Sequence, residues 1–362
     1  MAYRVYGALL DSLMSDNPKL PTLRDVARKA GVSTATVSRC LNDPGKVVKD
    51  TRERVQAAVD ALGYMPNFAA RVMAARQSQT IGAIIPTMDN AIFARGLQSF
   101  QEELHHEGYT LLLSSTAYRP DIEEEQIRAL VARGADGLLL IGQDRVPGIY
   151  DFLRQRNVPS VLAWSYAPDT PVPCVGFDNR AAMRALAEAV IAQGHTRIGM
   201  IAGLSAGNDR ARNRLQGARD AVRRAGLSQD ALLVAETPYG VQEGMTVFRQ
   251  FMADPAPPTA VMCGNDVLAV GALREAQRLG LRVPADVSVT GFDDLEFAHI
   301  VAPALTTVHV PHRAMGRAAA RALVTMLRTQ KPVSSVELDT TLQRRASLGP
   351  CPSERDNPRV AP

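Results

Sequence analysis

The stretch TLRDVARKAGVSTATVSRCLN, residues 22–42, decides the fold of the N-terminal part of the chain. Apolar residues recur there at the spacing of a helix with one buried face, at Leu23, Val26, Ala27 and Ala30. Thr22 can cap the start of this helix, and Gly31 can end it because glycine readily takes the left-handed conformation. Ser33 can cap a second helix only two residues later. The pattern therefore predicts two helices joined by a tight turn.

A third helix is expected after this pair. The sequence Asn-Asp-Pro-Gly at residues 42–45 is typical of a turn, and Asp50 and Thr51 then open a helix that ends at Gly63. We expect residues 21–66 to form an all-α helix-turn-helix head. In such a head the second helix enters the major groove of DNA.

The charge and the exposed side chains of this head fit DNA. Residues 21–76 hold ten Lys/Arg against five Asp/Glu, an excess that favours a polyanion, although a solvated basic surface would give the same count. The exposed face of the second helix would carry Thr34, Ala35, Ser38 and Arg39. Arg39 can bond bidentately to guanine, while the Thr34 methyl group and Ala35 can contact a thymine methyl group. Side chains suited to phosphate contacts are Thr22, Ser33, Thr36 and Asn42.

The pattern changes after residue 80 to apolar strands that alternate with amphipathic helices. The expected strands are 81–86, 109–115, 136–142, 159–164, 197–203, 259–264 and 288–293. The expected helices are 91–107, 121–133, 179–193, 209–225 and 265–279. This alternation predicts α/β architecture with parallel sheets wrapped by helices. Residues 79–348 are more than one such sheet needs, so we expect two lobes with a ligand cleft at the carboxyl ends of the strands.

Composition excludes several other classes of protein. With 46% hydrophobic and 22% charged residues, the chain is typical of a soluble globular protein rather than a collagen-like, disordered or membrane-embedded one. No signal peptide or spanning segment is recognisable, and the four cysteines form no CxxC pair. We therefore expect a cytoplasmic protein without a metal or cofactor. Residues 1–20 and the proline-rich residues 349–362 are expected to be a disordered extension and a disordered tail.

The N-terminal motif resembles that of the LacI/GalR family of bacterial transcriptional repressors. The resemblance continues through V-x-x-x-T-R-x-R-V and LGYMPNFAARVM, and later through VGFDN, RLQGARDA, NDVLAVGAL, VPADVSVTGFDD and PALTTV. It implies a periplasmic-binding-protein-like effector domain at residues 79–348, and a homodimer or tetramer that binds a near-palindromic operator in double-stranded DNA. NAIFARGLQSF and VGFDN look most similar to gluconate-type repressors, which implies a sugar or a sugar acid such as gluconate as the effector.

The resemblance also implies a hinge helix at residues 67–78. It would fold on the minor groove beside its partner, with Met73 as the apolar wedge where the family usually has leucine. Alternatively, Met73 only packs between the two hinges.

Matched residue by residue, the resemblance places effector-binding side chains at Phe93, Trp164, Arg214, Tyr239, Asn265, Asp266 and Asp293. Phe93 and Tyr239 fall where aromatic platforms usually sit, and Trp164 replaces a polar residue common at the cleft edge. Arg210 lies one helical turn before Arg214 and could face an anionic group, or be a surface charge. Effector binding would shift the population of the two lobe arrangements and change the affinity for DNA.

Two other functions would also fit parts of the sequence. Residues 203–207, Gly-Leu-Ser-Ala-Gly, match a hydrolase nucleophile elbow, and Asp293 and His309 follow in hydrolase order. The sequence lacks a segment that would form an oxyanion hole, and a hydrolase would leave the basic head without a role. We therefore expect no enzymatic activity. A transport-type binding protein of the same two-lobed fold is disfavoured by the helix-turn-helix.

Overall fold

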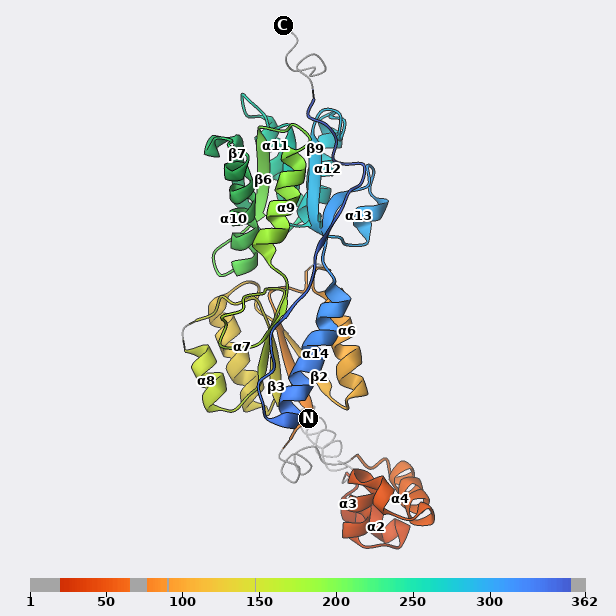
Figure 1. Cartoon of the computed structure of the whole chain (residues 1–362). Helices are drawn as coiled ribbons and strands as arrows, with labels where there is room; N and C mark the ends of the chain where they lie inside the picture. Colours follow the sequence, from red (N-terminus) through yellow and green to blue (C-terminus); the bar gives the residue numbers. More distant parts are fainter. Residues whose placement is uncertain (1–19, 66–76, 90, 147, 353–362) are drawn as a thin grey trace, which may run out of the picture. The chain divides into compact units, whose positions relative to one another are not determined.

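The computed structural model describes residues 20–65, 77–89, 91–146 and 148–352. The chain divides into two compact units after Ser78, and each is considered by itself (Figure 1).

The first unit is a three-helix head, as predicted. Its elements are α2 (Leu23–Ala30), α3 (Thr34–Asn42), the 3-10 turn η1 (Pro44–Lys46) and α4 (Lys49–Leu62). Gly31 ends α2 at a φ of 67°, in the left-handed conformation expected for it. The third helix begins earlier than predicted, at Lys49, and the residue before it, Val48, is extended. The small core includes Val26, Val37, Val55 and Tyr64.

The second unit contains two lobes, each built on a six-stranded sheet. Lobe 1 has the strand order β11-β5-β4-β3-β1-β2, and all neighbouring strands run parallel. Its strands are β1 (Thr80–Ile85), β2 (Thr110–Ser115), β3 (Gly137–Ile141), β4 (Ser160–Ala163), β5 (Cys174–Gly176) and β11 (Val336–Glu337). Its helices are α6 (Ala94–His106), α7 (Pro120–Ala132), α8 (Ile149–Gln155) and α14 (His312–Thr329).

Lobe 2 repeats this design with the order β12-β10-β9-β8-β6-β7, in which only β12 runs antiparallel to its neighbour. Its strands are β6 (Ile198–Gly203), β7 (Leu232–Thr237), β8 (Ala260–Cys263), β9 (Ser288–Asp293), β10 (Thr306–His309) and β12 (Thr341–Gln343). Its helical elements are α9 (Asn179–Ile191), α10 (Asp209–Arg224), η2 (Gln229–Ala231), α11 (Val241–Met252), α12 (Asp266–Arg278) and α13 (Phe297–Ile300).

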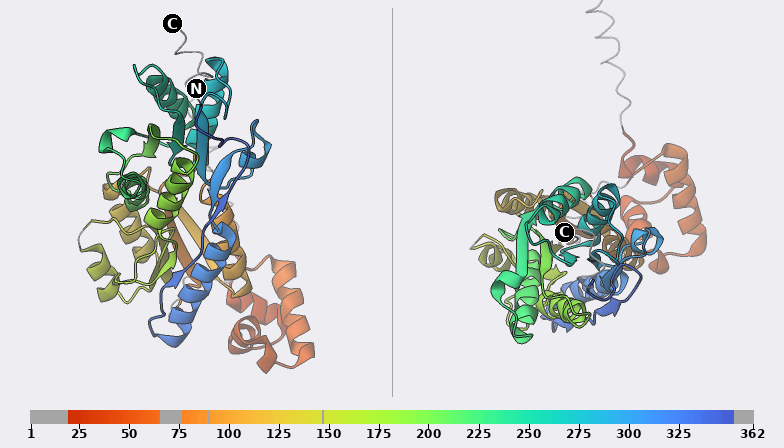
Figure 2. Two further views of the ribbon diagram at one scale, coloured as in Figure 1. Left: turned by 45° about the horizontal axis from the view of Figure 1, so that its top comes forward. Right: turned by 90° about the horizontal axis from the view of Figure 1, so that it is seen from above.

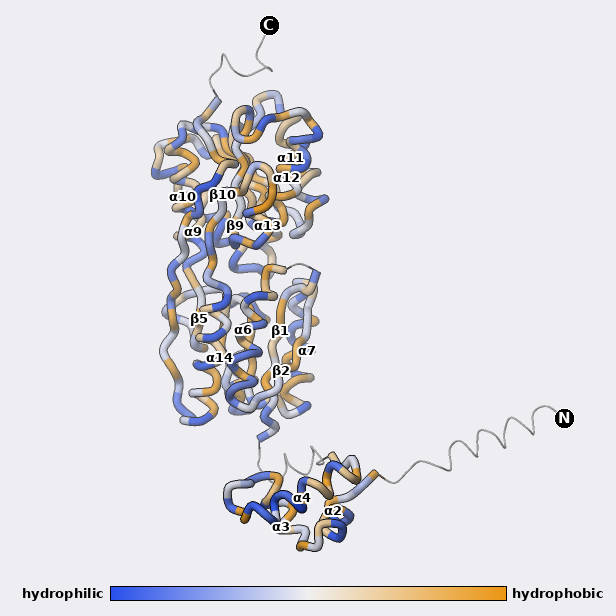
Figure 3. Tube along the Cα trace, turned by 90° about the vertical axis from the view of Figure 1, so that its right-hand side faces the viewer, coloured by the Kyte–Doolittle hydropathy of each residue, from blue (hydrophilic) through white to orange (hydrophobic). Residues whose placement is uncertain are grey.

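Helices cover both faces of each sheet, because successive residues of a buried strand point to opposite sides. On β1, Ile81 and Ala83 pack in one core with α6 and α14, whereas Ile84 packs in another with α7 and α8. On β6, Met200 faces α9 and α10, whereas Ile201 faces α11 and α12. Along the covering helices, hydrophobic and hydrophilic segments alternate (Figure 3).

The chain passes between the two lobes three times. It leaves lobe 1 after β5, returns between β10 and α14, and crosses again between β11 and β12. The last crossing is the dark-blue segment that runs beside α14 toward lobe 2 (Figures 1 and 2). The three connections hold the carboxyl ends of the two central sheets toward each other, where the sequence predicted a cleft.

The end of the described chain differs from the expected disordered tail. The carbonyl group of Gly349 lies 3.1 Å from His195 Nε2, and the Cys351 N–H donates to the Gln193 carbonyl group at 2.8 Å. Residues 349–352 therefore belong to lobe 2. No helix in the described part of the chain is long and apolar enough to cross a membrane.

Candidate functional site

Helix α3 presents a polar surface on the head. Thr34, Ala35, Arg39 and Asn42 are exposed, and Thr36 and Ser38 are half-buried beside them. Val37 and Cys40 point into the core, so the helical repeat turns the other side chains outward. Within the described residues, no hydrogen bond or ion pair holds the Arg39 guanidinium. It is therefore free to bind an outside acceptor.

The hydroxyl and amide side chains predicted to contact phosphate first stabilise the head itself. The Thr22 N–H and hydroxyl groups both donate to the Asp25 carboxylate, at 2.9 and 2.7 Å, and these bonds lower the pKa of Asp25. Ser33 Oγ accepts from the Thr36 N–H at 3.1 Å and caps α3. These caps fix the angle of the turn between the two helices.

The basic side chains of the head are weakly paired. The ion pairs Lys46–Asp43 and Lys49–Glu53 span 3.4 and 3.7 Å, and their side chains are largely exposed. Exposed pairs of this kind contribute about 0–1 kcal/mol each, so a polyanion can displace them. Met73, the predicted wedge, lies outside the described residues.

The second candidate site lies between the lobes and is centred on Arg214 and Asp293. Arg214 Nη2 is 3.6 Å from Asp293 Oδ1, and both side chains are buried; we call them the buried ion pair. Arg214 also donates to Asn179 Oδ1 at 2.9 Å and to the Gly264 carbonyl group at 2.6 Å. Its guanidinium lies 3.9 Å from the centroid of the Phe292 ring, which supports it from one side. Arg214 is thus held rigidly from several directions.

Asp293 has the opposite environment. Neither of its carboxylate oxygens has a hydrogen-bond partner within the described residues, although the residue is 0% exposed. Burial raises the pKa of Asp293 to about 6, and the Arg214 guanidinium opposes the shift. Its backbone is strained, with a φ of 105°. Backbone strain and unsatisfied buried oxygens are both features of functional sites, so Asp293 stays a candidate ligand contact.

Asn265 and Asp266 lie near the buried ion pair, but only one of them has a polar atom free to bind a ligand. Asn265 Oδ1 caps α12 by accepting from the Leu268 N–H, while its Nδ2 is buried without a hydrogen-bond partner in the described chain. Asp266, in contrast, accepts from the Leu295 N–H at 2.7 Å and from the Thr307 hydroxyl at 2.6 Å. The structure therefore makes Asp266 a link between α12 and the strands beside it, not the ligand contact that we expected.

A cavity of about 460 Å³ opens between the lobes. Its walls come from both, at Thr87, Asp89, Ala117, Tyr118, Leu204, Ser205, Ala206, Asn208, Glu236, Pro238 and Tyr239. The rings of Tyr118 and Tyr239 are 6.1 Å apart and tilted by 47°. Burial raises the pKa of both hydroxyl groups, and both sense the charges of the buried ion pair. Tyr239 was predicted; Tyr118 was missed, although it follows the second expected strand at the edge where ligands bind.

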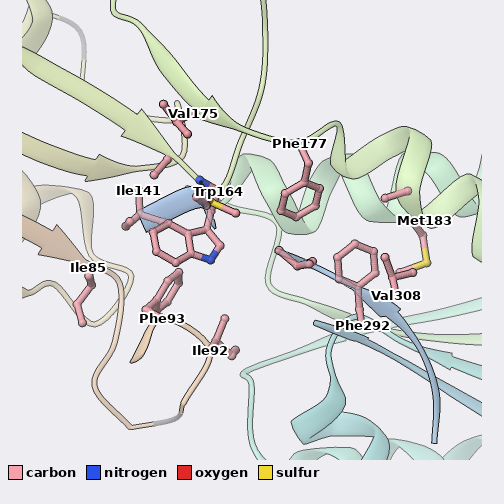
Figure 4. Packing of buried hydrophobic residues seen from close by; sticks show 14 of the residues in the cluster. Ile85, Ile92, Phe93, Ile141, Trp164, Val175, Phe177, Met183, Phe292 and Val308 are labelled. Carbon is pink, nitrogen blue, oxygen red and sulfur yellow. Dashed lines mark hydrogen bonds between the residues drawn. The ribbon is translucent and has the colours of Figure 1, made fainter. Parts of the chain in front are cut away.

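Phe93 and Trp164, expected to line the cleft, lie in the apolar core instead. They meet edge to face at 5.3 Å, and Trp164 is only 1% exposed (Figure 4). Of the predicted effector residues only Tyr239 belongs to the walls of the cavity; Phe93 and Trp164 do not, nor do Arg210, Arg214, Asn265, Asp266 and Asp293. An aromatic residue that follows a strand can line a cleft or pack in the core. Here the two side chains pack against α6 and α14 and lie in the core.

Arg210 is buried, which excludes the alternative of a surface charge. Its Nη1 donates to Asp209 Oδ1 at 2.9 Å, and the guanidinium reaches Gly142 at the end of β3 in lobe 1. A Cβ at Gly142 would overlap Arg210, so only glycine admits the arginine there. Next to it, Arg212 forms a bidentate ion pair with Asp144 at 2.7 and 2.8 Å. Helix α10 of lobe 2 is thereby tied to the end of β3.

The chain is similar to known regulators in both units. Residues 22–67 match the family described as bacterial regulatory proteins, lacI family, and residues 187–348 match the periplasmic binding protein-like domain. The HTH-type transcriptional repressor CytR of Escherichia coli strain K12 is 37% identical over 85% of this chain and 90% of its own length. The regulator GntR of the same strain is 32% identical over 91% of this chain and 99% of its own. The lac repressor dimer, solved with operator and an anti-inducer, covers 91% of this chain and all of its own with a TM-score of 0.80 at 28% identity.

Proposed function

The chain belongs to the LacI family of bacterial regulatory proteins, and from this premise we propose how its DNA-binding and effector-binding sites work. It is a DNA-binding transcriptional regulator controlled by a small molecule. The head reads operator DNA with α3, through Thr34, Ala35, Ser38 and Arg39. Exposure of this face and the unpaired Arg39 support the proposal. We further propose a homodimer that binds two operator half-sites, with residues 67–78 as the hinge.

The effector enters the cavity between the lobes and reaches Asp293 and Asn265 from it. Neither residue is among the cavity walls, but Tyr118 and Tyr239, which are, sense the charge of Asp293. The observation that carries this proposal is that two Asp293 oxygens and Asn265 Nδ2 are buried without hydrogen-bond partners among the described residues. Such groups cost about 1–3 kcal/mol each until something pairs with them. A polyhydroxylated molecule supplies both the donors and the acceptors, and Arg210 and Arg214 suit an added carboxylate. A sugar or a sugar acid such as gluconate therefore fits the site.

Binding controls DNA affinity by a population shift between lobe arrangements. The cavity walls come from both lobes, and the ion pair Arg212–Asp144 joins them at its edge. A ligand that bridges the walls stabilises the closed arrangement and changes the operator affinity by its differential affinity for the two states.

We propose no enzymatic activity for this chain. The Ser205 hydroxyl donates to Glu236 at 2.6 Å, whereas His309 Nδ1 lies 2.9 Å from Asp294. The residues of the apparent hydrolase motif thus have other partners. Its relatives are named as transcriptional regulators, and we expect it to act in the cytoplasm, where operator DNA lies.

The proposal is tested by selecting genomic fragments that bind the protein and by measuring their affinity with and without gluconate, other aldonates and neutral sugars. We expect one class of ligand to change operator affinity at least about tenfold. Asp293→Asn should abolish that response, while Asp169→Asn, at an exposed site, should keep it. No fragment preference in the wild type would refute the function.

A further inference from the structure

Trp164, the single tryptophan of the chain, lies beside the effector site without touching the cavity. It follows β4 in lobe 1 with a φ of 61°, an uncommon conformation for a large side chain. Gly96 on α6 makes room for it, because a Cβ there would come within 2.6 Å of two indole carbons. The backbone N–H group of Trp164 donates to the sulfur of Met315. The surroundings of this side chain are therefore closely fitted to it.

One path of hydrogen bonds leads from the indole to the buried ion pair through His312. Trp164 Nε1 donates to His312 Nδ1 at 3.2 Å, and His312 Nε2 lies 3.2 Å from the Asp293 carbonyl oxygen. Since that oxygen only accepts, Nε2 carries the proton and Nδ1 is free to accept from the indole. Burial lowers the pKa of His312 to about 4, so the ring is neutral near pH 7. Both ring nitrogens are thus satisfied in one tautomer.

A second path leads from the backbone of Trp164 to the same pair through Asn179. The Asn179 amide donates to the Trp164 carbonyl group at 3.0 Å and accepts from Arg214 Nε at 2.9 Å. The 3.6 Å contact of the buried ion pair joins the two paths. The five residues form a closed ring, which we call the coupling ring.

The coupling ring joins the two lobes. Trp164 and His312 belong to lobe 1, at the end of β4 and the start of α14, whereas Asn179, Arg214 and Asp293 belong to lobe 2. Two of the three crossings between the lobes therefore begin or end at ring members. A displacement of the buried ion pair changes the bonds to Trp164 and to the first turn of α14.

We propose that Trp164 and His312 are positioning residues, which transmit the state of the buried ion pair to lobe 1 through the coupling ring. The inference rests on the proposed function, because it takes the buried ion pair as the group that holds the effector. It assigns to Trp164 a role in coupling, where the sequence had suggested direct contact with the ligand.

The single tryptophan makes this coupling measurable in the full-length protein without any ligand. Arg214→Lys removes the bond to Asn179, whose amide holds the backbone carbonyl group of Trp164. We expect it to raise the acrylamide quenching constant of Trp164 at least about twofold, because a loosened ring opens locally more often. Arg219→Lys is the matched control, on the same helix but exposed and outside the ring, and it should leave quenching as in the wild type. His312→Gln should raise quenching too, whereas His106→Gln, at an exposed histidine, should not.

Equal quenching in Arg214→Lys and Arg219→Lys would overturn the proposal. If circular dichroism shows that Arg214→Lys does not fold, Asn179→Ala, which removes both hydrogen bonds of the second path, takes its place in the same comparison. Calorimetric titration with gluconate and neutral sugars separates the two hypotheses. A quenching difference without binding of any of these ligands would support the coupling and contradict the proposed effector class, while binding without a quenching difference would do the reverse.

Discussion

Replacing Asp293 by asparagine should stabilise the ligand-free protein. The carboxylate is buried, and its pKa is raised from 3.8 to about 6, so the folded protein binds this proton more tightly than the unfolded chain does. At pH values above 6 the charged form therefore costs about 3 kcal/mol of unfolding free energy, at about 1.4 kcal/mol per pKa unit. The cost falls as the pH drops from 6 toward 4, and at pH 5 it is about 1.5 kcal/mol. The amide of the variant would carry no charge and would escape this cost.

Urea denaturation of Asp293→Asn and wild type at pH 7.5 and pH 5 measures the difference. We expect a gain of about 3 kcal/mol at the higher pH and about half of it at the lower one. Asp169→Asn should change neither value by more than about 0.5 kcal/mol, since the residue is exposed. A loss of stability at pH 7.5, or a gain independent of pH, would refute the view that Asp293 is held at a cost for ligand binding.

Three further predictions concern the head and the contact between lobes. Arg39→Ala should weaken operator binding by about 1–3 kcal/mol and relax the preference at one base position; equal losses on operator and random DNA in gel-shift assays would contradict base readout. Lys46→Ala should weaken binding to all sequences alike and reduce the salt slope by about one, which titration at several salt concentrations measures. Gly142→Ala should impair effector binding in calorimetry because a Cβ displaces Arg210, whereas Gly148→Ala, also at positive φ but with open space around it, should not. Equal binding by both glycine variants would show that Arg210 is not needed.

The sequence predicted most of the central strands of both sheets and missed several other elements, both short and long. Strand β1 is buried at every position and was evident from its apolar run. Strand β7 was missed although Leu232–Ala235 are apolar; it lies at the sheet edge, where most of its residues are half-buried or exposed. Helix α14 was missed because Pro311 begins it without any side-chain cap. Local sequence patterns indicate which residues are buried, but they do not indicate which distant strands and helices pack together.

The candidate site could be predicted in part. Arg214, Asn265 and Asp293 came from the family resemblance, and the structure brings them together around unsatisfied polar atoms. Trp164 and Asp266 were assigned to the ligand, yet their partners are residues from strands and helices far along the chain. Such partners depend on how the lobes fold over each other, which no local pattern contains.

The three crossings between lobes limit how the domain can move. Three separate backbone connections prevent the lobes from moving apart. Rotation of one lobe against the other is then the movement of lowest free-energy cost. A molecule that bridges the walls can then act by turning one lobe against the other. Its chemistry decides which of the rotated arrangements it favours.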